Sequence, residues 1–526
     1  MEKKPISLLA LLRDAGILKA GGIADVGISG IASDSRQVAP GGLFVAVPGL
    51  TVDGHDFLEA AVEKGCAALV VERGRGRSFP GKKIPCVEVQ DSRVTLGALA
   101  ASFYGRPAER LVMIGVTGTN GKTTSTYLLE SVLKKAGANP GVIGTVNYRY
   151  EQVALPAPFT TPDPVFLQKM LADMSAAGVT HVLMEVSSHA LEQKRLESIL
   201  FDVALFTNLT RDHLDFHGSM EQYYLSKREL FFRHLKPKGK AVILCEKDIV
   251  SGLDWGERLR VELGERKKMA GEGEQAQILA CGLESGGVSV LAAEQSLAGI
   301  VARLRTPVGE VRLRSHMVGR FNLKNLLGAF GVGLALSLPV ERIVEGLESA
   351  PAAPGRLEKA NGPEGVGVFV DYAHTPDALE NVLQTLRELT AGRLVVVFGC
   401  GGDRDRGKRP LMGKVAGLLA DVVVLTSDNP RSEEPALILA EIEKGVEESG
   451  LPRMRVEALL REQGRKGYDL IISRREAIRT VLAHAVAGDV VVVCGKGHET
   501  YQITRKGKIF FDDRVEAVLQ SAVVNW

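Results

Sequence analysis

The chain has 526 residues, of which 45% are hydrophobic and 24% are charged. A single hydrophobic core does not support this length, so we expect roughly three domains of ordinary globular composition. Lys and Arg number 65 and Asp and Glu number 63, which gives a formal net charge of only +2. This balance excludes bulk electrostatic attraction to nucleic acid or to an anionic membrane, and we expect small molecules as partners.

The N-terminal segment and the cysteines indicate a cytoplasmic protein. The apolar run from Ile6 to Leu12 is cut by Arg13 and Asp14 and lacks a small-residue cleavage site. It therefore predicts an amphipathic helix rather than a signal peptide. No apolar run reaches the length of about 18 residues that a membrane span requires. The six cysteines form no CxxC pair, which is typical of reduced, buried thiols.

Short apolar segments alternate with helical stretches along nearly the whole chain. They include GGLFVAV, LVMIGV, THVLMEV, DVALF, GRLVVVFG and DVVVV. Continuous apolar runs are typical of strands covered on both faces, so the sequence predicts an α/β protein with mostly parallel sheets. Breaks at 104–107 and 351–355 predict domains at 1–107, 108–350 and 351–526.

Polar loops follow these strands directly. GTNGKTT follows LVMIGVT, and similar loops (SSH, TNLTRDHLD, CGGDRDRGKRP, SDNPR and CGKGHE) follow later strands. Any one of them is by itself an ordinary surface loop. In open α/β sheets, however, ligands bind at the carboxyl ends of the strands, so together these loops predict the functional site.

The segment GTNGKTT matches the second half of a phosphate-binding P-loop. Backbone N–H groups of 118–122 can surround phosphates, Lys122 can reach across them, and the Thr123 hydroxyl can bind Mg²⁺. The strict pattern is not met, because its first glycine falls on Val116. No NKxD segment occurs, which argues against a GTPase and leaves a kinase open.

Acidic and imidazole side chains follow the strands of the same segment. Glu185, Asp212 and His213 are hard or borderline ligands for a divalent cation. Each one alone is better explained as a surface or capping residue. In loops that face the P-loop they are candidates for ligands of a second metal ion.

Motifs along the chain carry a family resemblance. GVTGTNGKTT, EVSSHALEQKR, FTNLTRDHLDFHG, GRFNLKNLLGA, PGRLE, VDYAHTPDAL, FGCGGDRDRGKRPLMG, DNPRSEEP and GKGHETYQ occur in this order. With the opening segment SDSRQVAPGGLFVAVPG they resemble the Mur ligase family, most closely its members that add meso-2,6-diaminopimelate. The resemblance implies an N-terminal α/β domain for a UDP-linked substrate, a central P-loop ATPase-like domain and a C-terminal Rossmann-like domain.

The resemblance also implies a reaction. ATP would phosphorylate a carboxylate of UDP-N-acetylmuramoyl-L-alanyl-D-glutamate, and the amine of meso-2,6-diaminopimelate would attack the acyl phosphate. Lys122 and the metal ions, expected to be two Mg²⁺, would offset the repulsion between the anionic reactants. We expect a cytoplasmic monomer acting in peptidoglycan precursor synthesis.

The resemblance assigns roles to individual residues around ATP and metal. The residues expected to bind ATP are Gly118, Thr119, Asn120, Gly121, Lys122, Thr123, Thr124, Asn322, Asn325, Arg356 and Asp371. The residues expected to bind metal are Thr123, Glu185, His213 and Lys227, and those expected in catalysis are Lys122, Lys227, His213 and Glu185. Lys227 reads from its sequence alone as a solvated helix lysine. In this family the matching lysine is carbamylated by CO₂, which requires an amine with a lowered pKa.

Two further sets of residues are expected to bind the other substrates. For the UDP-linked substrate they are Ser33, Ser35, Leu50, Thr51, Val52, Thr160, Thr161, Ser187, Gln193 and Arg195. For the amino acid they are Arg404, Asp428, Asn429, Pro430, Arg431, Gly495 and Glu499. Phe159 departs from relatives that have an asparagine before the two threonines. We therefore assign no side-chain contact with the UDP-linked substrate to this residue.

The DNPR segment predicts which amino acid is added. Diaminopimelate carries a distal carboxylate that lysine lacks, and Arg431 supplies a cation for it. A surface arginine paired with Glu433 or Glu434 is the alternative role for Arg431. The same reaction with L-lysine, a folylpolyglutamate synthetase and a nucleotide-dependent binding switch remain as alternative functions. The segment 457–469 matches no motif.

Overall fold

The computed structural model describes residues 4–17, 23–49, 51–76, 84–247, 252–269, 276–462 and 464–523. The chain splits into two compact units. The first comprises Met1–Val288 and Leu327–Gly346, and the second comprises Ser289–Leu326 and Leu347–Trp526. The three-domain division drawn from the sequence stays a prediction.

The N-terminal part of the first unit is a small parallel sheet with helices on both faces. Its strand order is β3 (Ile31–Ala32), β4 (Leu43–Val45), β5 (Ala68–Glu72) and β6 (Cys86–Val89). Helices α1 (Leu8–Asp14) and α3 (Ser92–Phe103) share one apolar cluster with this sheet, and α2 (Leu58–Glu63) belongs to another. The expected amphipathic helix is α1, which begins where the Ala10 amide donates to the Ser7 hydroxyl.

The rest of the first unit is built on a larger, mostly parallel sheet. Its strands run in the order β10 (Val153–Pro156), β9 (Asn147–Tyr150), β8 (Pro140–Ile143), β11 (His181–Glu185), β7 (Val112–Thr117), β12 (Phe201–Phe206), β13 (Leu235–Leu244) and β14 (Gln277–Gly282). Within this order β9 pairs antiparallel with both β8 and β10, and the other described pairs are parallel. Because β7 lies between β11 and β12 in parallel register, the loops after these three strands meet at one edge.

Helices cover this sheet. They are α4 (Lys122–Lys135), α5 (Pro164–Ala176), α6 (Ser188–Glu192), α7 (Leu214–His217), α8 (Met220–Phe232) and α9 (Trp255–Met269). Further along the chain come α10 (Arg320–Ala335) and α11 (Val340–Ser349). Helices α5, α8 and α9 bury their apolar side chains in one cluster with the strands, as the runs of apolar residues predicted.

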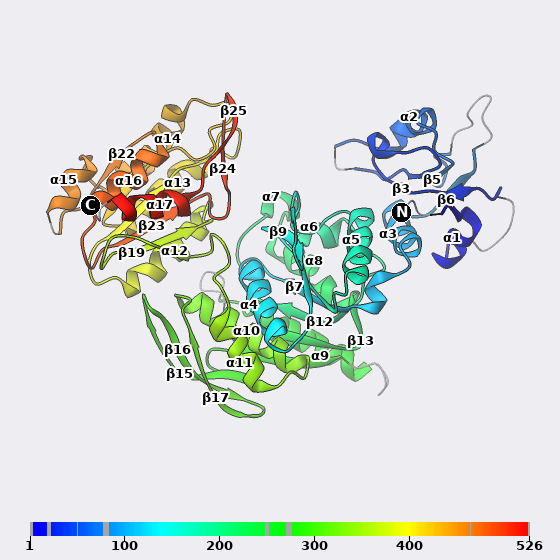
Figure 1. Cartoon of the computed structure of the whole chain (residues 1–526), viewed down its shortest axis with the longest axis horizontal. Helices are drawn as coiled ribbons and strands as arrows, with labels where there is room; N and C mark the ends of the chain where they lie inside the picture. Colours follow the sequence, from blue (N-terminus) through cyan, green and yellow to red (C-terminus); the bar gives the residue numbers. More distant parts are fainter. Residues whose placement is uncertain are drawn as a thin grey trace. The chain divides into compact units, whose positions relative to one another are not determined.

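The second unit contains the antiparallel strands β15 (Val288–Ser296), β16 (Gly299–Thr306) and β17 (Gly309–Ser315), and then a Rossmann-like layer (Figure 1). Its sheet order is β18 (Glu358–Ala360), β19 (Gly367–Asp371), β23 (Val490–Cys494), β20 (Leu394–Phe398), β21 (Val422–Leu425) and β22 (Gly467–Leu470). Helices α12 (Pro376–Leu389), α13 (Lys408–Leu419) and α14 (Pro435–Glu447) share one core cluster. Helices α15 (Val456–Arg461), α16 (Arg474–His484) and α17 (Asp513–Val523) share the other.

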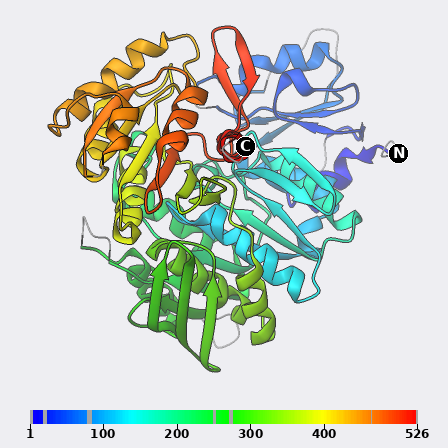
Figure 2. The ribbon, with the colours of Figure 1, turned by 60° about the vertical axis from the view of Figure 1, so that its left-hand side comes forward.

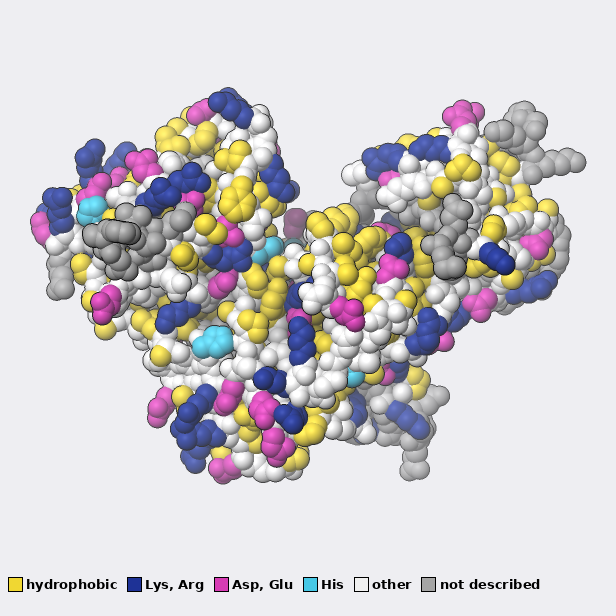
Figure 3. Space-filling view, viewed as in Figure 1, with side chains coloured by type: hydrophobic (Ala, Val, Ile, Leu, Met, Phe, Trp, Pro, Cys, Tyr) yellow, Lys and Arg dark blue, Asp and Glu magenta, His cyan; other side chains and the backbone are white. Residues whose placement is uncertain are grey.

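A two-stranded hairpin stands apart from this sheet. It consists of β24 (Tyr501–Thr504) and β25 (Gly507–Phe510), and Figure 2 shows it in red as a separate arm. Basic and acidic side chains are interspersed over the face drawn in Figure 3, as the balanced composition predicts. Among the described residues, no helix is long and apolar enough to cross a membrane.

The segment that matched no motif completes the second unit's core. It forms α15 and the edge strand β22. A buried arginine, Arg393, caps α15 by donating from Nη1 to the carbonyls of Leu459 (3.1 Å) and Leu460 (2.9 Å). The same guanidinium forms a paired contact with Asp489 through Nε (2.9 Å) and Nη2 (2.7 Å). The role of this segment is therefore to extend the sheet.

Replacing Asp489 tests that role. The Arg393 and Asp489 side chains are only 7% and 4% exposed, so Asp489→Ala leaves an uncompensated buried charge. We expect a loss of about 3–5 kcal/mol of stability in this unit. Amide hydrogen exchange in β20 and β23 measures the loss locally. The control Glu448→Ala breaks an exposed pair with Lys414 and should cost less than about 1 kcal/mol; equal exchange in the two variants would contradict the capping role.

Candidate active site

The P-loop connects β7 to α4 and is held from both sides. Lys122 Nζ folds back and donates to the carbonyls of Gly118 (2.8 Å) and Thr119 (2.8 Å). On the other side, the Asn120 amide donates to Asn208 Oδ1 (2.9 Å). A cation at the N-terminus of α4, beside a fixed loop, is a site for an anionic ligand.

Glu185 lies at the end of β11 and brings two loops together. It is 1% exposed, and its Oε2 accepts hydrogen bonds from the hydroxyls of Thr123 (3.0 Å) and Thr145 (2.9 Å). Its Oε1 accepts one from the Thr145 amide (3.0 Å). Sequence reasoning missed Thr145, although the residue follows β8 in the same way that the other predicted loops follow their strands.

Lys227 contacts the P-loop and is not the solvated lysine that its local sequence suggests. The residue is 1% exposed on α8, and its Nζ donates to the Gly118 carbonyl at 2.8 Å. Burial, with the positive charge of Lys122 nearby, holds the pKa of Lys227 well below its usual value. A lowered pKa raises the fraction of neutral amine, which is the form that reacts with CO₂.

His213 borders the P-loop from the loop after β12. Partial burial lowers the pKa of its imidazole, although the side chain is 46% exposed, and the cations of Lys122 and Lys227 lower it further against the opposing effect of Asp212. A neutral imidazole is the form that binds metal. In the part of the chain that the structure describes, no group of three or more His, Cys, Asp or Glu side chains could by itself hold a metal ion.

The residues predicted for the UDP-linked substrate adjoin Glu185. The Thr161 hydroxyl donates to the Glu185 carbonyl (2.8 Å) and accepts from the Ser187 amide (3.1 Å). Arg195 donates to the Thr161 carbonyl (2.8 Å) and to Gln193 Oε1 (2.7 Å). These contacts join the ends of β11 and its neighbouring loops into one polar wall.

Thr160 and Phe159 complete this wall. The Thr160 hydroxyl lies 3.0 Å from that of Thr145, which links the substrate-side threonines to Glu185. Arg195 lies over the Phe159 ring at 5.0 Å, and the phenylalanine is 56% exposed. In this sequence the residue before the threonines therefore contacts Arg195 through its ring.

The N-terminal candidates lie on loops of the small sheet. Ser33 and Ser35 are partly buried where the Asp34 side chain accepts from the Arg36 amide, and Thr51 and Val52 are exposed. Leu50 lies outside the described residues. An ion pair between Asp91 and Lys194 ties the cap of α3 to the segment that carries Gln193 and Arg195.

The remaining ATP candidates lie in the second unit. Asn322 and Asn325 are buried on α10, where Asn325 Nδ2 donates to Asn322 Oδ1 at 3.2 Å. Asp371 accepts from the backbone amides of Leu357 (2.6 Å) and Ala373 (2.7 Å), and burial raises the pKa of its carboxyl. Arg356 lies over the Tyr372 ring at 4.9 Å. Asp371 thus fixes the PGR loop on the end of β19.

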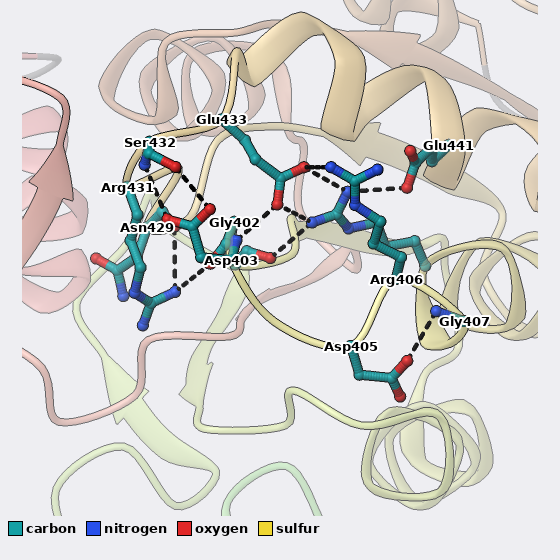
Figure 4. Close-up of polar contacts among 12 residues, drawn as sticks. Gly402, Asp403, Asp405, Arg406, Gly407, Asn429, Arg431, Ser432, Glu433 and Glu441 are labelled. Atoms are coloured by element: carbon teal, nitrogen blue, oxygen red, sulfur yellow. Dashed lines mark hydrogen bonds and ion pairs between the residues drawn. The ribbon is translucent and has the colours of Figure 1, made fainter.

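The loops predicted for the amino acid contact one another (Figure 4). Arg431 has a left-handed backbone (φ 52°) and donates from Nη1 to the Gly402 carbonyl at 2.8 Å. The Asp403 carboxylate accepts from the amide (3.1 Å) and the hydroxyl (2.7 Å) of Ser432. The Asp403 amide in turn donates to Glu433 Oε1 (2.6 Å). The loops after β20 and β21 therefore form one rigid edge, in which Pro430 is buried and Arg404 exposed.

Glu433, one of the two acidic residues considered as a surface partner of Arg431, binds another arginine. Glu433 accepts from Arg409 Nη2 at 2.9 Å, and Arg409 is fully buried. This contact is the main cause that lowers the pKa of Glu433 to about 2. The carboxylate is thus engaged by Arg409, while the described contacts of Arg431 are to backbone carbonyls.

Comparisons with known proteins agree with this geometry. The Mur ligase family catalytic domain matches residues 27–104, the Mur ligase middle domain 116–333 and the Mur ligase glutamate ligase domain 355–497. The UDP-N-acetylmuramoyl-L-alanyl-D-glutamate--2,6-diaminopimelate ligase of Geobacter sulfurreducens is 45% identical over 93% of this chain and 94% of its own. The chain belongs to the Mur ligase family.

Other Mur ligases are similar over nearly their whole length. The equally named ligase of Geobacillus thermodenitrificans is 44% identical over 93% of this chain and 94% of its own. A solved structure of such a ligase has a TM-score of 0.69 and 31% identity, covering 99% of this chain and 100% of that one. MurF ligase from Thermotoga maritima in complex with ADP has a TM-score of 0.59 at 21% identity, covering 93% and 96%, and shares the fold. The predicted family and α/β fold class are confirmed.

Gly118 provides a test of the P-loop. Its φ is +147°, and an added Cβ would lie 1.9 Å from Thr207 Oγ1, so Gly118→Ala must displace the loop. We expect this variant to lose most of the rise in melting temperature that a non-hydrolysable ATP analogue gives the wild type. Gly264→Ala is the matched control, because its Cβ would meet no atom within 4 Å. An unchanged response in Gly118→Ala would contradict phosphate binding by this loop.

Proposed function

We propose that this Mur ligase adds meso-2,6-diaminopimelate to UDP-N-acetylmuramoyl-L-alanyl-D-glutamate at the expense of ATP, in cytoplasmic peptidoglycan precursor synthesis. The observation that carries the proposal is the 45% identity, over 93% of the chain, to a ligase named for this reaction. The P-loop with buried Glu185 and Lys227 supports the phosphoryl-transfer half. The loop edge that carries Arg431 supports the choice of amino acid.

In the first half-reaction a carboxylate oxygen of the sugar dipeptide attacks the γ-phosphorus of ATP, and ADP leaves. Lys122, at the N-terminus of α4, would hold the β- and γ-phosphates and offset the approach of two anions. In the second, the amine nitrogen attacks the acyl carbon of the acyl phosphate. Phosphate leaves, and the nitrogen gives up a proton to form the amide.

The residues around Glu185 fit Mg²⁺. Thr123 and Glu185 offer a hydroxyl and a carboxylate 3.0 Å apart, and Mg²⁺ sites next to phosphates characteristically use only one or two protein carboxylates. A bound Mg²⁺ would neutralise charge between the carboxylate and the phosphate. Lys227 would join this site once its neutral amine attacks CO₂ and releases a proton to solvent, which leaves an anionic carbamate on its side chain. His213 would complete it as a neutral ligand.

On the substrate side, Arg195 supplies a fixed guanidinium. Its contacts to Thr161 and Gln193 hold the fork beside the polar wall, where it can pair with an anionic group of the nucleotide sugar peptide. In the second unit, Arg431 would pair with the distal carboxylate of diaminopimelate. Asp428 and Glu499 would accept from its distal ammonium, and Asn429 would hold Glu499 in place.

Comparing two amino acids tests the proposed selectivity. ATP-dependent incorporation into the UDP-linked dipeptide should have a kcat/KM about 100-fold higher for diaminopimelate than for L-lysine. The reason is that Arg431 forms charge-assisted hydrogen bonds of about 1.5–3 kcal/mol each only with the former. Arg431→Ala should raise the KM for diaminopimelate far more than that for ATP. Arg453→Ala, which removes an exposed guanidinium paired with the mostly buried Glu443, serves as the control. Equal rates with both amino acids in the wild type would refute the selectivity.

Replacing Lys227 tests the carbamate. Lys227→Ala should lower kcat by at least about 100-fold, because a ligand for the site's metal is lost, and added bicarbonate should not rescue it. Carbon-13 NMR of the wild type with labelled bicarbonate should show a carbamate signal that the variant lacks. Lys169→Ala, at an exposed pair with Asp173, should leave both the rate and the signal unchanged. Near-wild-type turnover of Lys227→Ala would remove the carbamate from the mechanism.

A further inference from the structure

Lys496 is a buried cation next to the loops of the amino-acid site. It follows β23 in the segment GKGHE, and its side chain is 0% exposed. Its Nζ lies 3.0 Å from Glu499 Oε2, 3.2 Å from Asn429 Oδ1 and 3.7 Å from Asp428 Oδ1. All three partners belong to the predicted amino-acid site, whereas Lys496 itself was not among the predicted residues.

The contacts of Lys496 set the orientation of Asn429. The amide oxygen accepts from Lys496 and from the Ile503 backbone N–H (2.9 Å). The amide nitrogen therefore points the other way and donates to Glu499 Oε2 (2.8 Å). Glu499 Oε2 thus receives two donors, and the carboxylate is held in one rotamer.

The hairpin formed by β24 and β25 contacts the backbone of the loop that carries Asp428 and Arg431. Gln502 Nε2 donates to the Asp428 carbonyl (2.6 Å), and Arg505 Nε donates to the Ser432 carbonyl (2.7 Å). The Arg431 amide donates to the Ile503 carbonyl (3.0 Å). The backbone is thus held by β24, while the acceptor side chains share a single cation.

Two carboxylates share the Lys496 cation. Its Nζ lies 3.7 Å from Asp428 and 3.0 Å from Glu499, so one ammonium offsets the repulsion between two anions. Asp428 is 8% exposed, and its Oδ1 is buried without a hydrogen-bond partner among the described residues. An incoming ammonium would add a second cation beside these two carboxylates. Without Lys496, two like charges would lie together and repel.

We propose that Lys496 is a positioning residue that keeps Asp428 and Glu499, directly and through Asn429, oriented as the ammonium-accepting wall of the amino-acid site. It acts through these three side chains. The inference deepens the proposed function and rests on it, because the wall matters only if a diamino acid is the substrate. In this proposal Arg431 recognises the distal carboxylate of the substrate, and the side chains that Lys496 positions recognise its distal ammonium.

The test uses the full-length enzyme with Lys496→Met and Lys496→Gln. Methionine removes both the charge and the donors, whereas glutamine keeps a neutral donor. We expect the KM for diaminopimelate to rise at least about tenfold in Lys496→Met and less in Lys496→Gln. The KM for ATP and for the UDP-linked dipeptide should stay within about twofold. Lys414→Met, at an exposed pair with Glu448, is the control and should match the wild type.

The outcomes separate this inference from the proposed function. If the wild type incorporates diaminopimelate but both variants keep its KM, the positioning role is wrong and the ligase function stands. A parallel rise in all three KM values, or loss of folding in both variants, would make Lys496 a general structural residue and also overturn the inference. If the wild type does not incorporate diaminopimelate, the proposed function itself fails.

Discussion

The candidate active site depends on the parallel register of β11, β7 and β12. With β7 in the middle, the P-loop lies between the end of β11, which carries Glu185, and the loop after β12. The Thr123–Glu185 hydrogen bond and the Lys227 contact to the Gly118 carbonyl are both consequences of this order. A different strand order would separate the phosphate site from the acidic residue.

Lys227 and Lys496 are both buried in candidate sites, but the charges that surround them differ. Lys227 lies near another cation, Lys122, and its hydrogen bond goes to a backbone carbonyl, so desolvation favours its neutral form. Lys496 lies between Asp428 and Glu499, and its charge compensates theirs. The same residue type therefore lies beside another cation in one unit and between two carboxylates in the other.

The structure explains several residues whose role the sequence misjudged or left open. Lys227 reads as a solvated lysine because its neighbours in the chain, Ser226 and Arg228, are polar, yet α8 turns it onto the P-loop. Thr145 follows a strand and Lys496 lies within the GKGHE motif, yet neither was predicted, because their contacts are to partners distant in the chain. The segment 457–469 showed no motif because its function is packing, with Arg393 capping its helix.

The sequence by itself determined the α/β class and the family, and it predicted the P-loop and the loops that would carry the chemistry. These are local properties: apolar runs of strand length, a glycine-rich turn before a helix, and motifs whose residues are neighbours in the chain. Only the tertiary structure decided which side chains share a site, which are desolvated and which charges face one another. Glu185 meets Thr145, and Lys496 meets Asn429, through strand order and helix packing, and pKa values follow from these surroundings rather than from residue type.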